Sequence, residues 1–205
     1  MSDEQVLVVP TQFVNEVLDD AVKVTNDKDR AVGIVNQLLN SGMTTFMPRE
    51  FAEKAPEFKQ LIPYIVLVHD NQYFRYQRGK GGGEQRLHKK YSLGFGGHIN
   101  QSDYDGSFRD TFYNGLQREL WEELQISIGD VRNYRITPAI DVINDNSDEV
   151  GEVHLGLVFA VVCTNPELKT HEADLGDAGW DSVENIMANK DKYESWSQIL
   201  IERGL

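Results

Sequence analysis

The segment 153–163 constrains the fold of this chain most strongly, because it is apolar almost without interruption. Such a strand is typical of the centre of a sheet whose two faces are both covered. Strand patterns also occur at 64–69 and 136–142, and helical spacing occurs at 29–39 and 182–189. Because strands and helices alternate without a strict repeat, we expect an α/β or α+β fold in which helices cover a mixed sheet.

The charge balance limits the partners of the protein. The 205 residues include 20 basic and 33 acidic side chains, which gives a net charge of −13. A surface of this kind repels phosphate backbones, so we expect no general nucleic-acid binding. A small phosphorylated molecule stays compatible with it, because a divalent cation held by carboxylates reverses the local field. The alternative explanation is that the acidic surface only keeps the protein soluble.

Length and apolar runs favour one domain that acts away from membranes. A chain of 205 residues suits a single domain with an elaborated end. The longest strongly apolar runs, 65–68 and 155–163, are too short to span a bilayer, and no secretory signal is visible at the start. Cys163 is the one cysteine, so no intrachain disulfide forms, which fits a reducing compartment. We therefore expect a cytoplasmic protein without a membrane partner.

The first 60 residues have a different pattern from the rest. They contain a short apolar segment at 6–9 that stops at Pro10, a helical pattern at 29–39, and a short helix or turn at 48–59. No flexible linker separates them from the following residues. We therefore predict an N-terminal extension, residues 1–60, packed on a main domain formed by residues 61–205.

The clearest helical pattern, residues 110–125, carries three glutamates. Glu119, Glu122 and Glu123 stand at i, i+3 and i+4, so they share one face of the helix. Three carboxylates in that arrangement repel one another, and a hard cation such as Mg²⁺ or Mn²⁺ would relieve the repulsion. The alternative is an amphipathic helix whose acidic face is simply solvated. A neighbouring row of leucines can anchor the helix to a sheet: Leu116, Leu120 and Leu124.

A glycine-rich loop precedes this helix and strengthens the metal-site hypothesis. Residues 94–97 follow a predicted strand, and glycines there allow backbone atoms to approach a ligand closely. The loop and the glutamates together resemble the signature box of the Nudix hydrolases. That box is a glycine, five residues, a glutamate, seven residues, then Arg-Glu-aliphatic-any-Glu-Glu-any-Gly-aliphatic. The residues that match its second half are Arg118, Glu119, Leu120, Glu122, Glu123 and Ile126.

The chain departs from that box at three places. Asp110 stands where the family has its first glutamate, so a carboxylate is kept with a shorter reach. Gly97 is equivalent to the first glycine only with an insertion of about seven residues, because Tyr104 occupies the regular position. Gln125 replaces the closing glycine, so either this glutamine adopts a left-handed conformation or the helix ends differently.

The resemblance covers about residues 60–200 and implies a Nudix-like α/β/α sandwich with a mixed sheet. It implies a metal-dependent hydrolase, with Mg²⁺ or Mn²⁺ as cofactor, that cleaves a diphosphate linkage in a nucleoside diphosphate derivative or a similar small molecule. It implies that Arg118 and Asp110 orient the glutamates, although Arg118 also fits an ordinary ion pair on a helix. The implied metal ligands are the carboxylates of Glu119, Glu122 and Glu123 and the carbonyl of Gly97.

The general base and the substrate-binding residues are less directly implied. Family members place the base either in the box or on a loop before the last strand, so Glu119 and Glu172 are the two candidates. Glu172 also fits a plain loop carboxylate. Arg78, in a basic hairpin, and His98, in the glycine loop, are predicted to bind substrate. The alternatives are a solvated hairpin edge for Arg78 and a structural loop residue for His98.

Two classes of function therefore stand side by side. The intact glutamates favour a metal-dependent hydrolase. The changes at Asp110 and Gln125, the insertion and the N-terminal extension favour a non-catalytic Nudix-fold module that binds a nucleotide or a protein partner. Because all three helix carboxylates are intact, we favour the enzyme, and the fold alone would not decide. A homodimer is the default expectation for a soluble enzyme of this size.

Overall fold

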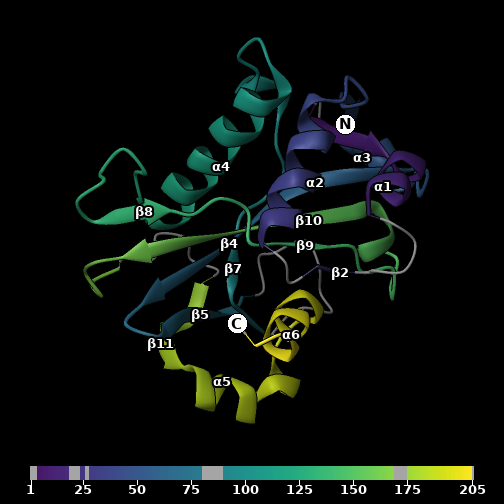
Figure 1. Ribbon diagram of the computed structural model, residues 1–205. Helices are drawn as coiled ribbons and strands as arrows, with labels where there is room; N and C mark the ends of the chain where they lie inside the picture. The colour runs from purple at the N-terminus through teal and green to yellow at the C-terminus, as the bar shows by residue number, and fades with distance from the viewer. Residues whose placement is uncertain (1–3, 19–23, 26–27, 80–89, 169–174, 205) are drawn as a thin grey trace. The chain divides into compact units, whose positions relative to one another are not determined.

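The computed structural model describes residues 4–18, 24–25, 28–79, 90–168 and 175–204. It divides into two compact units, each built from three separate stretches of the chain. Two long strands, β4 (Phe58–His69) and β10 (His154–Cys163), and the helix α4 (Phe108–Leu124) contribute residues to both units (Figure 1). The first unit comprises Met1–Tyr64, Gly96–Arg118 and Pro138–Phe159, and the second comprises Ile65–Phe95, Glu119–Thr137 and Ala160–Leu205.

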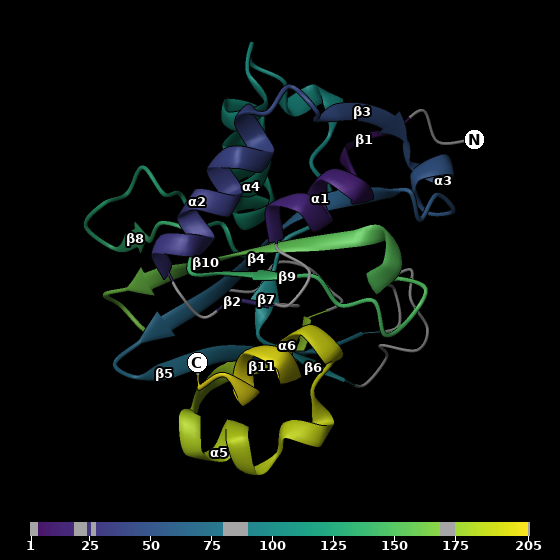
Figure 2. The same ribbon diagram turned by 45° about the vertical axis from the view of Figure 1, so that its right-hand side comes forward.

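The first unit combines strands with three N-terminal helices. β1 (Gln5–Pro10) pairs antiparallel with β3 (Thr45–Pro48) and with the start of β4. Further strands follow in the order β4, β10, β9 (Asp141–Ile143) and β2 (Val24–Thr25). The contacts of α2 with α1 and with β9 hold the helices to these strands (Figure 2). The helical segments are α1 (Thr11–Leu18), α2 (Lys28–Asn40), α3 (Arg49–Ala52), η2 (Gln101–Asp103) and η3 (Gly151–Val153).

Apolar spacing explains why these N-terminal elements fold. In α1, Val14 and Leu18 lie one turn apart and are both buried. β1 is buried throughout its middle, from Val6 to Val9. In α2, the buried positions follow the helical period: Ala31, Ile34, Val35, Leu38 and Leu39. The N-terminal residues therefore supply a large part of the core of the first unit.

The second unit is built around β5 (Gln72–Arg78), which pairs antiparallel with the end of β4 and with β11 (Leu175–Ser182). Three short strands extend it: β6 (Tyr91–Ser92) pairs with β5, β7 (Gly94–Phe95) with β4, and β8 (Tyr134–Ile136) with β10. The helix α5 (Val183–Ala188) contacts β11 and α6 (Ser195–Glu202), which follows the turn η4 (Lys190–Lys192) (Figure 2). Aromatic rings with centroids 4.7–6.0 Å apart contribute to its packing: Phe74, Tyr76, Phe95 and Trp180.

β4 and β10 run in the same direction, which makes the sheet mixed. Near the start of both strands, the Lys59 amine donates to the Gly151 carbonyl at 2.7 Å. At their ends, Nδ1 of His69 hydrogen-bonds with the Cys163 carbonyl at 2.8 Å. The strand pairs given above are antiparallel. The predicted class, α/β or α+β with a mixed sheet, is therefore confirmed.

Local predictions hold for the long elements and fail at one strand. The helical pattern at 110–125 corresponds to α4, and the apolar segment at 153–163 corresponds to β10. The single strand expected at 136–142 is wrong, because β8 ends at Ile136 and β9 begins at Asp141. Pro138 lies between them and lacks the backbone N–H that a strand ladder needs. The domain boundary after residue 60 stays a prediction, since the first unit joins residues 1–64 to later segments.

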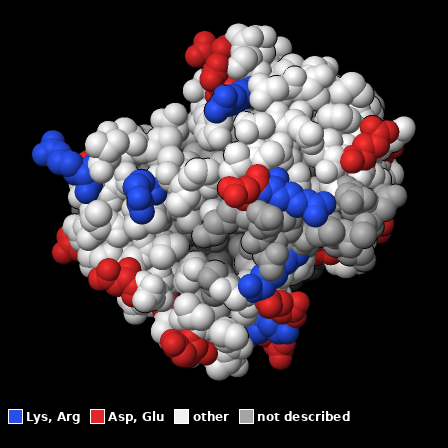
Figure 3. Space-filling model, in the orientation of Figure 1, with Lys and Arg blue, Asp and Glu red and all other residues white. Residues whose placement is uncertain are grey.

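Charged side chains of both signs are interspersed on the face shown in Figure 3. Several basic side chains pair with acidic neighbours: Arg49 with Glu4 and Glu53, and Lys190 with Glu202. Exposed pairs of this kind contribute little to the stability of a fold. Within the part of the chain that the structure describes, no helix combines the length and the apolar character needed to cross a membrane.

Candidate functional site

A hydroxyl cap fixes the start of α4 and engages one predicted site residue. The Ser107 hydroxyl accepts the backbone N–H of Asp110 at 3.0 Å and donates to the Asp110 carboxylate at 2.7 Å. Such a cap supplies a partner to one of the N–H groups that a first helical turn leaves unsatisfied. Asp110 is exposed, and its carboxylate serves the helix start here. Its orienting role stays a prediction.

Arg118 is held by the insertion that distinguishes this chain from the family box. Its Nε and Nη2 donate to the two carboxylate oxygens of Asp103 at 2.9 and 3.0 Å, and Nη2 also donates to the His98 carbonyl at 2.9 Å. Asp103 is buried and accepts the N–H of Asn100 at 2.8 Å, which closes the turn η2. A bidentate pair fixes both the position and the plane of a guanidinium. Asp103 was not predicted from the sequence, although the Asn-x-x-Asp spacing around η2 is a capping signal.

The acidic face of α4 lies in the second unit. Glu119, Glu122 and Glu123 occupy i, i+3 and i+4 of one continuous helix. Glu122 is exposed, Glu119 and Glu123 are half-buried, and Oε2 of Glu123 is shielded from solvent. Carboxylate oxygens are the donors that Mg²⁺ and Mn²⁺ prefer, so the donor set fits such an ion. Among the described residues, no three His, Cys, Asp or Glu side chains already converge as a metal site.

The end of α4 shows how Gln125 takes the place of the glycine in the box. Gln125 has a φ of 53°, the left-handed conformation that glycine favours. Its N–H donates to the Trp121 carbonyl at 2.9 Å, and the N–H of Ile126 donates to the Leu120 carbonyl at 3.2 Å. Ile126 and Leu120 are both buried, so the chain leaves the helix toward the core. The first alternative is therefore the correct one, and the strain costs about 1 kcal/mol.

The loop before α4 requires glycine at one position for steric reasons. Gly96 has a φ of 136°, and a Cβ atom there would lie 1.9 Å from the Pro63 carbonyl oxygen. Two backbone segments therefore meet where a side chain does not fit. Gly97, the predicted carbonyl ligand, is half-buried and lies outside regular secondary structure. Its role as a ligand stays a prediction.

His98 and His154 form a pair of imidazoles in the first unit. Their Nε2 atoms are 3.4 Å apart, and Nδ1 of His154 hydrogen-bonds with the Val150 carbonyl at 2.7 Å. A carbonyl only accepts, so Nδ1 of His154 carries its proton and Nε2 of His98 is the donor between the rings. Burial, and then the neighbouring charge of Arg49, lowers the pKa of His98 to about 3, and burial also lowers the pKa of His154. At neutral pH, His98 is therefore uncharged, and its one N–H is directed at His154.

In the second unit, the predicted substrate-binding residue Arg78 faces a carboxylate that the sequence did not single out. Nη2 of Arg78 lies 3.8 Å from Oε2 of Glu194, whose side chain is 7% exposed. Burial raises the pKa of the nearby Tyr76 phenol, the charge of Arg78 lowers it, and the charges of Glu123 and Glu194 raise it. Arg78, Glu194 and a glutamate of the acidic face therefore lie near one buried ring. No local signal marked Glu194 as a partner of Arg78, because the two residues are far apart in the sequence.

Part of the predicted site lies outside the described residues, including the alternative base Glu172. Asp177, a few positions later, has a φ of 41° at a bulge in β11. Its carboxylate pairs with Arg75 at 2.9 Å and accepts the Tyr91 hydroxyl, and these contacts, the Tyr91 hydroxyl first, lower the pKa of Asp177. Asp177 therefore joins β11 to the neighbouring strands β5 and β6.

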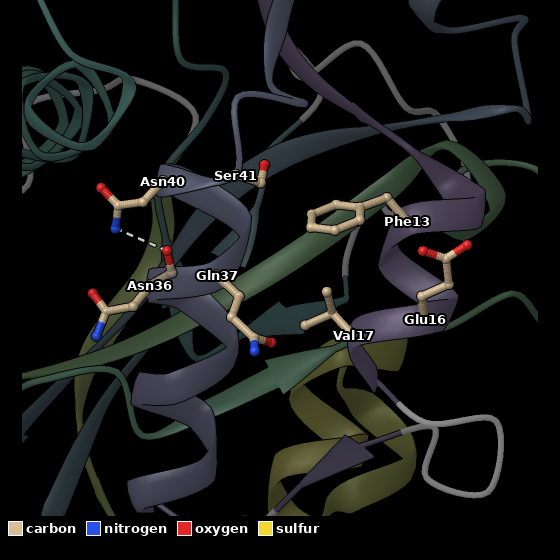
Figure 4. A pocket seen from close by; sticks show the side chains of 7 residues that line it. All are labelled: Phe13, Glu16, Val17, Asn36, Gln37, Asn40 and Ser41. Atoms are coloured by element: carbon tan, nitrogen blue, oxygen red, sulfur yellow. Dashed lines mark hydrogen bonds between the residues drawn. The ribbon is translucent and has the colours of Figure 1, made fainter.

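A separate groove lies between α1 and α2 in the first unit (Figure 4). Its volume is about 760 Å³, and α1 contributes Phe13, Glu16 and Val17 to one wall. The predicted site residues do not line it, so it is not part of the candidate site. The other wall carries amide and hydroxyl side chains: Asn36, Gln37, Asn40 and Ser41.

The chain is similar along its whole length to a bacterial protein. Protein YmaB of Bacillus subtilis (strain 168) is 32% identical over 203 residues, which are 98% of this chain and 97% of that protein. No protein-family model matches the chain.

Solved structures show the same arrangement of strands and helices. Tm1382, described as a candidate Nudix hydrolase, is 25% identical, with 98% of this chain and 97% of that chain covered and a TM-score of 0.75. DR0079 from Deinococcus radiodurans is 14% identical over 70% of this chain and 81% of its own, with a TM-score of 0.51. The NUDIX domain of Shewanella oneidensis NrtR, solved with ADP ribose, is 15% identical over 71% of this chain and 85% of its own, with a TM-score of 0.52. The last two are likenesses of fold alone.

Proposed function

We infer that this chain, which belongs to the Nudix hydrolase family, hydrolyses a phosphoanhydride linkage in a nucleoside diphosphate derivative or a similar small molecule. One observation carries the proposal. Glu119, Glu122 and Glu123 keep the spacing of the family box on a continuous helix, and Gln125 adopts the left-handed conformation that glycine favours. Because one fold supports many functions, the proposal of catalysis rests on this acidic face and not on the fold.

The metal-binding residues would be the three glutamates and the carbonyl of Gly97. An Mg²⁺ or Mn²⁺ ion held there would neutralise charge on phosphate oxygens. Arg118 precedes the acidic face on the same helix, and its bidentate pair with Asp103 fixes the residue that leads into that face. We propose that this anchoring is how Arg118 orients the glutamates. Asp110 would contribute by fixing the start of the helix.

The reaction forms one P–O bond to water and breaks the bridging P–O bond, which leaves two phosphorylated fragments. In our proposal Glu119 takes the proton of the attacking water, and Glu172 is the alternative base. Arg78 binds an anionic group of the substrate. His98 is neutral, since burial keeps its pKa low; its one N–H is directed at His154, so its Nδ1 would accept a hydrogen bond from the substrate. A homodimer and a cytoplasmic location stay predictions.

A hydrolysis panel tests the proposal directly. The purified protein is incubated with nucleoside diphosphate sugars, dinucleoside polyphosphates, nucleoside triphosphates and ADP ribose, the compound in the NrtR structure. Each reaction is run with Mg²⁺, with Mn²⁺ and with a chelator, and the phosphorylated products are separated and quantified. We expect release from one chemical class, dependent on the metal and abolished by the chelator.

The alternative function, a binding module without catalysis, makes the opposite prediction. If no compound of the panel is hydrolysed although calorimetry shows that Mn²⁺ binds, the enzymatic proposal is contradicted. Binding of one of the same compounds without turnover would then support the module. The departures at Asp110 and Gln125 are the sequence features that favour this second reading.

A further inference from the structure

Glu194 is a buried carboxylate that the proposed reaction does not yet use. It precedes α6, and one oxygen, Oε1, accepts the hydroxyls of Ser92 at 2.9 Å and Ser197 at 3.0 Å. Ser197 in turn accepts the backbone N–H of Leu93 at 2.9 Å, and the N–H of Glu194 donates to the Tyr91 carbonyl at 2.9 Å. These contacts come from β6, the residue after it, and α6. The carboxylate is therefore held in one orientation by residues 91–93 and by α6.

The other oxygen of Glu194 faces Arg78. Oε2 lies 3.8 Å from Nη2 of Arg78, which is longer than a direct hydrogen bond but short enough for a strong charge attraction. Glu194 is 7% exposed, whereas Arg78 is 35% exposed. The fixed member of the pair is thus the carboxylate, and the guanidinium keeps a surface toward solvent. An anion that arrives from solvent meets the arginine and not the glutamate.

Arg78 also lies near the acidic face of α4. The charges of Arg78, Glu123 and Glu194 all act on the buried Tyr76 phenol, which donates to the Gly94 carbonyl at 3.0 Å. Glu123 is a predicted metal ligand, so Arg78 and Glu194 lie near the same buried ring as a carboxylate of the metal face. A phosphate that reaches the metal face would carry negative charge within reach of this guanidinium.

A purely structural role does not explain why residue 194 is charged. The two serine hydroxyls need only an acceptor, and a neutral glutamine oxygen would serve them as well. Burying a carboxylate costs free energy unless a cation compensates for it. The charge at position 194 is explained if its role is to attract and position the guanidinium of Arg78.

We propose that Glu194 is a positioning residue that holds Arg78 in place to bind a phosphate group of the substrate. The proposal rests on the proposed phosphoanhydride hydrolysis and adds a residue outside the family box to the same site. Among the described residues, the oxygens of Glu194 face Ser92, Ser197 and Arg78, so the proposal assigns it no direct contact with the substrate. It acts through the arginine.

The test compares Glu194→Gln with the matched control Glu202→Gln. Glutamine keeps an acceptor for the serines and removes the charge that faces Arg78. We expect KM to rise about tenfold while kcat changes less than about twofold. Glu202 pairs with Lys190 on the exposed side of the second unit, so the control should keep the wild-type KM. A thermal unfolding midpoint close to that of the wild type shows that Glu194→Gln is folded.

A double-mutant cycle decides whether Glu194 acts through Arg78. In an Arg78→Gln background, Glu194→Gln should raise KM by less than about twofold further. Independent, multiplying effects on KM would overturn the proposal. A fall of kcat with unchanged KM in Glu194→Gln would also overturn it, since Glu194 would then act on the reaction step.

Failure of the proposed function can be separated from failure of this inference. The binding of inorganic pyrophosphate with Mg²⁺ is measured by calorimetry for the wild type and the three variants, whether or not hydrolysis is found. Weakening by about tenfold in Arg78→Gln and in Glu194→Gln, but not in Glu202→Gln, supports the inference even for a protein without turnover. Equal affinity in all four proteins would overturn it.

Discussion

Arg118 in the first unit and Arg78 in the second unit both face a buried carboxylate, but the two pairs have different geometry. Arg118 donates to both oxygens of Asp103 at 2.9 and 3.0 Å and to a backbone carbonyl as well. Arg78 lies 3.8 Å from one oxygen of Glu194, and the other oxygen of that carboxylate accepts two serine hydroxyls. The first arginine is fixed by its partner, whereas the second is attracted by a partner that is itself fixed.

The difference indicates how each charge is used. A bidentate pair that is largely removed from water stabilises the position of a chain segment, and here it locates the residue before the acidic face of α4. A longer pair leaves the guanidinium able to exchange part of its interaction for a phosphate. We expect substitutions of Arg118 to be seen mainly in stability and substitutions of Arg78 mainly in substrate binding. Four experiments test this contrast.

The largest effect is expected when both arginines are kept and the acidic face is changed. The double variant Glu122→Gln/Glu123→Gln removes two predicted metal ligands without changing side-chain size. Hydrolysis should fall by about a hundredfold or more, because the charge compensation for phosphate is lost. Initial rates at saturating Mn²⁺ measure the loss. The matched control is the double variant Glu184→Gln/Glu202→Gln on α5 and α6. Full activity in Glu122→Gln/Glu123→Gln would contradict the site assignment.

A second experiment compares the two arginines in stability. Arg118→Gln leaves Asp103 buried with a broken bidentate pair, so the free energy of unfolding should fall by about 3 kcal/mol. Arg78→Gln should lower it by a smaller amount, about 1–2 kcal/mol, because the pair is longer and Arg78 is partly exposed, although Glu194 is left buried without this cation. Urea unfolding of both variants gives the comparison. Equal losses would refute the contrast between a fixed and an attracted arginine.

A third cation, Lys59, provides a comparison with the two arginines, because neutral oxygens and not a carboxylate accept its hydrogen bonds. Its amine is buried and donates to the Asn146 side-chain oxygen at 2.5 Å and the Gly151 carbonyl at 2.7 Å. Burial lowers its pKa to about 8, against the charges of Glu152 and Asp145, which raise it. The folded state therefore loses this proton at lower pH than the unfolded state does, so stability should increase as the pH rises from about 8 toward about 10.

The expected gain from Lys59 is about 1–2 kcal/mol over that interval. It is measured as the free energy of unfolding in urea at several pH values. Lys59→Met keeps the length of the side chain and cannot titrate, so its pH profile should lack the rise. Parallel profiles for the two proteins would show that Lys59 does not titrate in this window.

The smallest effect concerns the end of α4. Gln125 adopts a left-handed conformation, so Gln125→Gly should relieve strain and increase the free energy of unfolding by about 0.5–1 kcal/mol. Steady-state rates should not change, because the backbone at position 125 already has the left-handed conformation that glycine favours. A loss of stability in the glycine variant would mean that contacts of the glutamine side chain outweigh the strain.

The extent to which the sequence predicted this molecule depends on how far apart the interacting residues lie. The acidic face followed from a local spacing, and the left-handed Gln125 was one of two alternatives that local rules allow. The break at Pro138 was missed, because a strand was predicted through it, although a proline without an N–H rarely lies inside a ladder. These features depend on a few neighbouring residues.

Features that depend on distant pairing were missed. Asp103 lies in the insertion, to which no position of the family box corresponds. Its partner Arg118 is 15 residues further along the chain. Glu194 meets Arg78 only because β5, β6 and α6 come together. The loop that contains Glu172 lies outside the described residues, so the choice between Glu119 and Glu172 as general base stays with experiment.

The interleaving of the two units along the chain affects how the protein is made. The first unit needs residues up to Phe159, and the second needs the C-terminal segment that begins at Ala160. On the ribosome, the apolar strand β1 therefore emerges long before the strands that complete its unit. Non-local closure of this kind slows folding and leaves apolar segments open to aggregation during synthesis. The two units should consequently mature late and almost together, and truncated chains that end after residue 64 should depend on chaperones to stay in solution.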